Sequence, residues 1–234
     1  MASQVLTNAK LWVDEHDLSG QMNALAVEYG VEALDETTFG ETTRKHTGGL
    51  KTTTMSHEGY WTSSVDQTVF NRIGSTTVVT ISGDTGATGD DAYLAQSLGT
   101  SYAPGGAVGE LLSFTVDMEA AGPLVRGKML ANQTASGTGT ASVQQLSAAG
   151  ATENVYGALH VVSLATGATL TMKIQSDSTT GFGSPTDVVS FTAATGTSAE
   201  WKSTAGPNTD TYYRASWTLT GGLASFIVSA GIGD

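Results

Sequence analysis

The residues of this chain that could do chemistry are few and widely spaced. It has four histidines, His16, His46, His57 and His160, and none has the His-Glu-x-x-His spacing that sets two imidazoles on one helix face. His160 lies in an apolar, strand-like run, so a packed core residue is the favoured interpretation. His46 and His57 lie in a polar segment and are expected to be solvent-exposed or interfacial. We therefore predict no metal site and no cofactor.

The acidic residues do not suggest catalysis. Asp84, Asp90 and Asp91 could offer carboxylate oxygens to Ca²⁺, but their spacing matches no EF-hand loop, and a solvated turn is favoured. Asp35 and Glu36 are adjacent rather than separated across a sugar ring, so no glycosidase pair can be named. The sequence also lacks a GxSxG elbow and a phosphate-binding loop. No catalytic residue is predicted, and a glycoside hydrolase is the weakest of the functions considered.

Aromatic residues near the end of the chain give one further possibility. Trp201, Tyr212, Tyr213 and Trp217 could form a platform on which a sugar stacks. Alternation over residues 213–219 instead favours Tyr213 and Trp217 as core residues. A carbohydrate-binding β-sandwich module thus stays an alternative function.

Composition and charge indicate an all-β protein with an acidic surface. Of 234 residues, only 14% are charged and 29 are glycine, which is typical of short strands joined by Gly-rich turns. The net charge is −12; residues 1–132 hold 16 acidic and 7 basic side chains, hence −9, and the rest hold −3. Such a surface argues against ordinary nucleic-acid binding and is compatible with one that DNA passes without sticking. Without cysteine, there is no disulfide framework.

The elements that must position these residues begin with a strand over 21–31, where Leu25, Val27, Tyr29 and Val31 share one face. Residues 35–60 are rich in Thr, Gly and charge and are predicted to be a long loop. A helix is expected over 64–73, with capping-box spacing at Ser64 and Gln67 and a C-cap at Gly74. Strands over 110–118 and 124–131 are expected to form a hairpin.

A small, polar run at 134–140 predicts a domain boundary. Alternating runs after it, with a hairpin turn at Gly221-Gly222, predict a smaller β-sandwich over 134–234. The first domain, over 1–133, would hold the long loop and the helix. No secretory signal and no membrane-spanning run is expected.

Several runs together resemble the major tail tube protein of long-tailed, siphovirus-type bacteriophages. They are DLSG at 17–20, LDETTFG at 34–40, the GL and GYW of 49–61, SYAPGGAVGELLSF at 101–114 and PLVRG at 123–127. The resemblance covers most of residues 8–132. It implies a tail-tube-type β-sandwich with one flanking helix, in which six copies close into a ring by sheet-to-sheet contact and rings stack through the long loop. The second domain would decorate the outside of the tube.

The resemblance also implies partners and a location. The partners would be further copies of the chain, the tail tip or baseplate, the tape measure protein and the tail terminator, with DNA passing unbound and no membrane involved. The protein would be made in the host cytoplasm and reside in the virion tail. The alternative within the virion is a capsid decoration or fibre protein.

Two sets of residues follow from these expectations. The ring-stacking candidates are Phe39, Arg44, Lys45, His46, Leu50, Lys51, Met55 and His57. A lumen that conducts DNA should repel phosphate, so the inner wall is expected to be acidic and built from the first domain. The candidates for that wall are Glu28, Glu110, Asp117 and Glu119.

Overall fold

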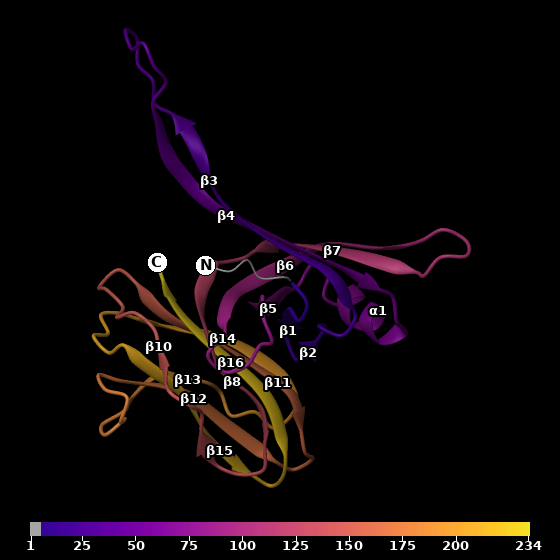
Figure 1. Ribbon diagram of the computed structural model, residues 1–234, viewed down its shortest axis with the longest axis vertical. Coiled ribbons are helices and arrows are strands. Elements are labelled where there is room, and N and C mark those ends of the chain that lie inside the picture. The colour runs from indigo at the N-terminus through magenta and orange to yellow at the C-terminus, as the bar shows by residue number, and fades with distance from the viewer. Residues whose placement is uncertain (1–5) are drawn as a thin grey trace.

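Residues 6–234, which the computed structural model describes, form sixteen strands and one helix in two antiparallel sheets (Figure 1). The predicted all-β class with one helix is confirmed. The elements, in chain order, are β1 (Lys10–Val13), β2 (His16–Asp17), β3 (Met22–Asp35), β4 (His46–Tyr60), α1 (Ser63–Phe70), β5 (Thr76–Ser82), β6 (Asp91–Gly105), β7 (Ser113–Ala120), β8 (Val125–Ala135), β9 (Gly139–Thr140), β10 (Gln144–Gln145), β11 (Asn154–Leu164), β12 (Thr169–Asp177), β13 (Thr186–Ser190), β14 (Ser198–Ala205), β15 (Tyr212–Thr220) and β16 (Ala224–Gly233).

The larger sheet folds back on itself along the long strand β6. The first part of β6 pairs with β5, which continues to β1, and its last part pairs with β7, which continues to β4 and β3. A register shift between Gly99 and Ser101 interrupts the β6–β7 pairing, and such a bulge bends a strand. The two layers enclose a core that includes Ile81 and Phe114, and α1 adds Val65 and Val69 to it.

The second half of the chain forms a sandwich. Strands β14, β11, β16 and β8 face the smaller sheet of β10, β15, β12 and β13, with β9 beside β15. The core between them includes Trp217 and Phe226, whose ring centroids lie 5.1 Å apart. The predicted boundary at 133/134 falls inside β8, which pairs with β6 on one side and β16 on the other.

The two halves are joined by buried contacts as well as by this shared sheet. Val78 and Leu94 of the first half pack with Tyr156 and Ala158 of β11. Trp12 belongs to a second cluster, formed with Ala92, Met129 and Ile227. These shared clusters and the shared sheet argue against independent folding of residues 1–133.

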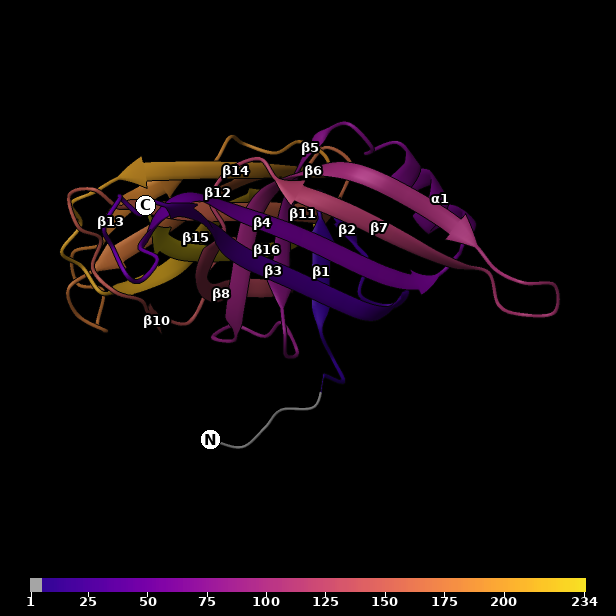
Figure 2. The same ribbon diagram turned by 90° about the horizontal axis from the view of Figure 1, so that it is seen from above.

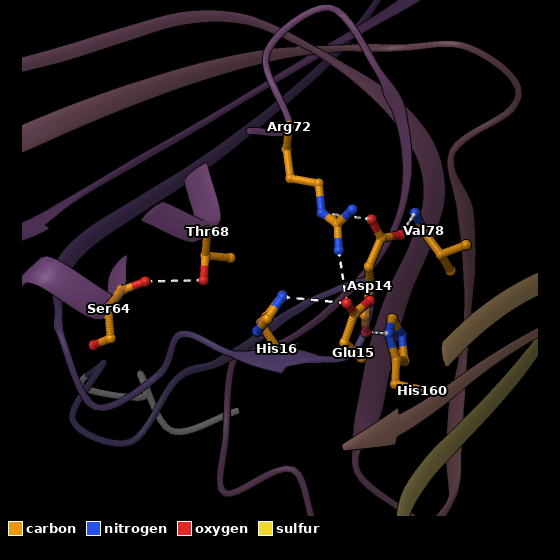
Figure 3. A network of polar contacts seen from close by, with 8 residues as sticks. All are labelled: Asp14, Glu15, His16, Ser64, Thr68, Arg72, Val78 and His160. Atoms are coloured by element: carbon orange, nitrogen blue, oxygen red, sulfur yellow. Dashed lines mark hydrogen bonds and ion pairs between the residues drawn. The ribbon is translucent and has the colours of Figure 1, made fainter. Parts of the chain in front are cut away.

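A chain of hydrogen bonds crosses the same junction, and Figure 3 shows its first contact, between His160 and Asp14. His160 Nδ1 lies 2.6 Å from the carbonyl oxygen of Asp14, and its Nε2 lies 2.8 Å from Thr80 Oγ1. A carbonyl oxygen can only accept, so Nδ1 carries the proton and Nε2 accepts from the Thr80 hydroxyl. Thr80 Oγ1 then accepts from Ser229, at 3.1 Å. Burial lowers the pKa of His160 to about 4, which keeps the ring neutral.

An ion-pair cluster fixes the turn that supplies the Asp14 carbonyl. Arg72, just after α1, contacts the Asp14 carboxylate at 3.1 Å and donates to Glu15 at 2.8 Å (Figure 3). The other Asp14 oxygen accepts from the backbone N–H of Val78 at 2.8 Å. Asp14 itself has φ 50°, a left-handed conformation that Asp tolerates better than most residues.

Two predicted hairpins are wrong in their pairing, although their strands exist. Strands β7 and β8 do not pair with each other; both pair with β6. The turn at Gly221-Gly222 connects β15 and β16, which lie in opposite sheets. Alternation and turn residues identify strands and reversals of direction, but a reversal can lead to the facing layer as easily as to a neighbouring strand.

The helix is confirmed, with different ends. It spans Ser63–Phe70, and its N-cap is Thr62, whose side chain accepts from the Val65 N–H at 3.3 Å. The predicted capping box at Ser64 is therefore wrong, as is the C-cap at Gly74, because Asn71 ends the helix. Gly74 has φ 78° and belongs to the turn that follows.

Candidate assembly surfaces

The predicted loop over 35–60 is wrong, because most of it is strand β4. Strands β3 and β4 pair from Met22↔Gly59 out to Asp35↔His46, so only residues 36–45 form the turn at the end. The sequence was misleading since Thr and Gly make the segment polar, while β-branched Thr favours strands. Polarity here reflects exposure of both faces rather than loss of secondary structure.

The outer part of this hairpin, residues 29–52, is named the arm. It projects far from the body (Figure 1), and every residue in it except Gly49 is exposed. Six of the predicted stacking residues lie on it: Phe39, Arg44, Lys45, His46, Leu50 and Lys51. Phe39 and Leu50 are 110% and 80% exposed, respectively. Lys45 pairs with Glu41 within the arm, whereas Lys51 reaches back to Asp234 at 2.9 Å.

Sequence reasoning missed three further exposed apolar residues of the arm. Tyr29, Val31 and Leu34 are 55%, 57% and 43% exposed. The signal was present, because the alternation that begins at Leu25 continues without a break through Val31. That pattern predicts an apolar stripe, and the stripe simply runs past the end of the body.

The prediction that Met55 and His57 take part in stacking is wrong. They are 2% and 1% exposed, because β4 enters the body near Thr53 and turns alternate residues into the core. The His57 ring meets Phe114 edge-on with centroids 5.8 Å apart, and neither ring nitrogen has a hydrogen-bond partner among residues 6–234. Burial lowers its pKa to about 4, against a smaller opposing effect of Asp117.

Three of the four acidic candidates gather on the outward face of the β3–β4–β7–β6 layer. Glu28 and Glu119 both lie opposite Thr54 in the register, on its two sides. Asp117 lies in the next row, where its carboxylate accepts from Ser101 Oγ at 2.6 Å. This surface, named the acidic face, has a hollow of about 310 Å³ lined by these three carboxylates.

Glu58 joins the acidic face, although it was not singled out from the sequence. It lies opposite Ala24 on β3 and Thr115 on β7. Glu110 is absent from the face, because β7 starts at Ser113 and Glu110 lies in the exposed loop before it. Its predicted place on a strand is wrong.

Among the residues that the structure describes, no basic residue lies on the acidic face. Its positions, taken from the register of the four strands, are Ala24, Ala26, Glu28, Thr52, Thr54, Ser56, Glu58, Leu98, Ser101, Ala103, Thr115, Asp117 and Glu119. Four carboxylates among hydroxyl and small side chains give a negative surface that disfavours phosphate.

The layer that carries the acidic face has open strand edges on both sides. Within residues 6–234, β3 pairs only with β4, so its outer edge is unpaired. On the other side, pairing of β5 with β6 ends at Thr76↔Leu98, leaving one edge of residues 100–105 of β6 unpaired. An unpaired edge is a template for a strand of another chain.

The remaining chemical candidates have structural roles. Asp90 accepts hydrogen bonds from Thr85 and Ala87 within its turn. Hydrogen bonding from Lys128 lowers the pKa of Asp91. Tyr213 and Trp217 are 0% and 6% exposed, so both are core residues, as predicted. Neither is available to form a platform for a sugar. Within residues 6–234, no three His, Asp or Glu side chains gather closely enough to hold a metal ion.

Helix α1 is too short and polar to cross a membrane, and it is the one helix of residues 6–234. No protein-family model matches the chain, and no curated protein matches it.

Three of the solved structures to which the chain is similar are as follows. One, from the virion of a native gene transfer agent particle, is 17% identical over 52% of this chain and 97% of its own, with a TM-score of 0.44. The SPP1 Dit protein, a hub of the adsorption apparatus of phages infecting Gram-positive hosts, is 14% identical over 97% of this chain and 100% of its own, with a TM-score of 0.41. A chain of the sheath–tube complex of PVC, an extracellular contractile injection system, is 12% identical over 52% of this chain and 88% of its own, with a TM-score of 0.41. At these scores the likenesses carry no functional conclusion.

Proposed function

We propose that this chain is the major tail tube subunit of a long-tailed bacteriophage, a structural rather than catalytic protein of the virion tail. The observation that carries the proposal is the acidic face, a strand-built surface with four carboxylates and no basic residue. Facing a central channel, it would keep DNA moving because it offers phosphate no cation. Glu28, Asp117 and Glu119 are the lumen residues in this proposal.

The open edges on either side of the acidic face support ring formation. The β3 edge of one copy would meet the edge of β6 residues 100–105 on the next, so that the acidic faces form a continuous inner wall. Closure of such a head-to-tail contact removes every exposed edge of this layer. Six copies per ring is the number we propose.

The arm supports stacking of these rings. It buries almost nothing within its own chain and exposes Phe39, Leu50 and Tyr29, an unusual arrangement for a hairpin with no partner. Docked on an adjacent ring, it would cover these side chains. The ends of the tube would meet the tail tip or baseplate and the tail terminator, and the tape measure protein would occupy the channel during assembly.

The order of layers supports an outer position for the second half. The β4–β7 layer, with its acidic face, is followed by the first core, then by the β1–β5 layer, and only then by β11 and β14. The sandwich of residues 134–234 thus lies on the side away from the acidic face, where it would decorate the outside of the tube.

Negative-stain microscopy of the purified protein tests the proposal. Tubes with a central channel are expected, and a reconstruction of them should have an acidic inner wall. Particles that stay monomeric under all conditions, or a lumen that is net basic or lined by the second half, would overturn it.

A further inference from the structure

The layer that bears the acidic face has an exposed apolar projection at one end. This projection, named the tip, is the loop 106–112 between β6 and β7, and it extends beyond the body in both views (Figures 1 and 2). Val108, Leu111 and Leu112 are 107%, 72% and 43% exposed. Three large exposed apolar side chains in a seven-residue loop are unfavourable in a monomer, and such a surface is typical of an interaction site.

The opposite end of the same layer has a groove of about 390 Å³. Its walls are the base of the arm and the turn between β7 and β8, and it includes Tyr29, Gly122, Pro123 and Leu124. Tyr29 exposes 55% of its surface there. The ion pair of Lys51 and Asp234, at 2.9 Å, belongs to the lining as well.

The tip and the groove lie at opposite ends of the strands. Figure 2 shows the β6–β7 loop at one extreme of the molecule and the C-terminus, whose Asp234 lines the groove, toward the other. A projection and a hollow placed in this way make a heterologous contact, which repeats from copy to copy without closing on itself. A contact of this kind running along the strands builds a column of subunits.

We propose that the tip of each copy seats in the groove of a copy in the adjacent ring, with Val108 and Leu111 entering between Tyr29 and Leu124. This inference rests on the proposed tube function and names a partner surface for ring stacking beside the arm. The arm of the second copy leaves from the wall of the same groove, so it would run back along the first copy. The tip of one copy and the arm of the other would therefore both stabilise each ring-to-ring contact.

The contact is apolar rather than electrostatic. The tip brings Glu110, while the groove already holds Glu119 and Asp234 against the single cation Lys51. Charge gives no net attraction, so burial of the apolar side chains must stabilise the contact. Assembly is accordingly expected to persist at high salt.

A glycine of the groove offers a clean way to block it. A Cβ at Gly122 would meet nothing within 4 Å, so Gly122→Trp can fill the groove without disturbing the fold. Gly183→Trp is the matched control, because Gly183 also has open space and lies in the loop between β12 and β13. We expect Gly122→Trp to keep the wild-type melting temperature and lose tube formation, with Gly183→Trp normal in both.

The absence of cysteine permits a direct test of proximity. A Val108→Cys/Gly122→Cys variant, assembled and treated with a short bismaleimide, is expected to give a ladder of cross-linked multimers on a denaturing gel. Either cysteine alone can link two copies at most. Tubes without a ladder, or a Gly122→Trp protein that assembles normally, would overturn this inference and leave the tube function standing. Failure of the unmodified protein to form tubes would overturn the proposed function, and this inference with it.

Discussion

His57 and His160 are both buried, and they differ in whether their ring nitrogens are satisfied. His160 donates to the Asp14 carbonyl and accepts from Thr80, whereas His57 has neither bond. The sequence predicted His160 correctly because its neighbours are apolar. The sequence did not indicate that His57 is buried, because its polar neighbours Ser56 and Glu58 face the other side of the strand.

Acid should destabilise the fold through these two rings. The pKa of each falls to about 4 in the folded protein, from an ordinary 6.5. Between these values the unfolded chain binds protons that the folded chain cannot, so stability is full above pH 6.5 and declines down to pH 4. Each ring should account for roughly 3 kcal/mol over that window. Urea unfolding at pH 7, 5.5 and 4.5 would measure the decline, and a flat profile would contradict it.

Replacing each histidine with leucine should have opposite effects. His57→Leu removes a buried polar group without partners and should leave stability unchanged or raise it by about 1 kcal/mol. His160→Leu leaves the Asp14 carbonyl and the Thr80 hydroxyl unsatisfied and should cost about 3 kcal/mol. Denaturant midpoints at pH 7 compare the two variants. Equal losses would show that His57 is held by something other than packing.

At the scale of elements, the arm shows what a sequence pattern can and cannot give. The alternation from Leu25 to Val31 correctly predicts a strand. The return strand, β4, was missed because both of its faces are exposed to solvent between His46 and Thr52. No apolar alternation therefore marks this part of the strand. A strand with two exposed faces has the composition of a loop, and only its pairing with β3 distinguishes it.

Removing the arm should separate folding from assembly. Replacing residues 32–50 with Asn-Gly would join Val31 to Lys51, which already lie opposite each other in the register. Little buried surface is lost, so the melting temperature should shift by no more than about 2 °C. Light scattering and microscopy should find no tubes.

A finer variant of the arm serves as its control. Phe39→Ser with Leu50→Ser keeps the hairpin and its backbone pairing but removes two exposed apolar groups. It should weaken assembly rather than abolish it. Normal tubes from the shortened protein would show that the arm plays no part in stacking.

At the scale of the whole molecule, the predicted boundary at 133/134 stays a prediction, and the two halves of the chain share one sheet. Two hydrophobic cores exist, but the core of the second half also includes Leu130 and Ala131 of β8, which precede the polar run at 134–140. The shared sheet could not be foreseen, because β16, the last strand, returns to pair with β8 from the first half. Pairing between strands some 90 residues apart leaves no local trace in the sequence.

The two halves should consequently unfold together. Truncation after Ala135 would uncover Trp12, Met129 and Val125, each at most 1% exposed in the full chain, and free one edge of β8. Calorimetry of the full chain should give one transition whose calorimetric and van't Hoff enthalpies agree. The truncated chain should aggregate. Two transitions and a soluble, folded fragment would instead favour the boundary at 133/134.

The acidic face makes a prediction about the assembled tube. Glu28→Lys with Glu58→Lys reverses two carboxylates of the acidic face, on β3 and β4, that lie outside the groove. Repeated around each ring, the new cations would hold phosphate, so short duplex DNA should be retained inside the tube and protected from nuclease. Retention should fall with salt, with a log–log slope of about −0.9 for each phosphate neutralised.

A second variant separates this effect from net charge alone. Lysine at four exposed threonines of the second half adds the same +4 outside the acidic face; these are Thr186, Thr195, Thr218 and Thr220. Its tubes should bind DNA that nuclease still digests. Protection by the wild-type tube, or none by the Glu28/Glu58 variant, would mean that the acidic face does not line the channel.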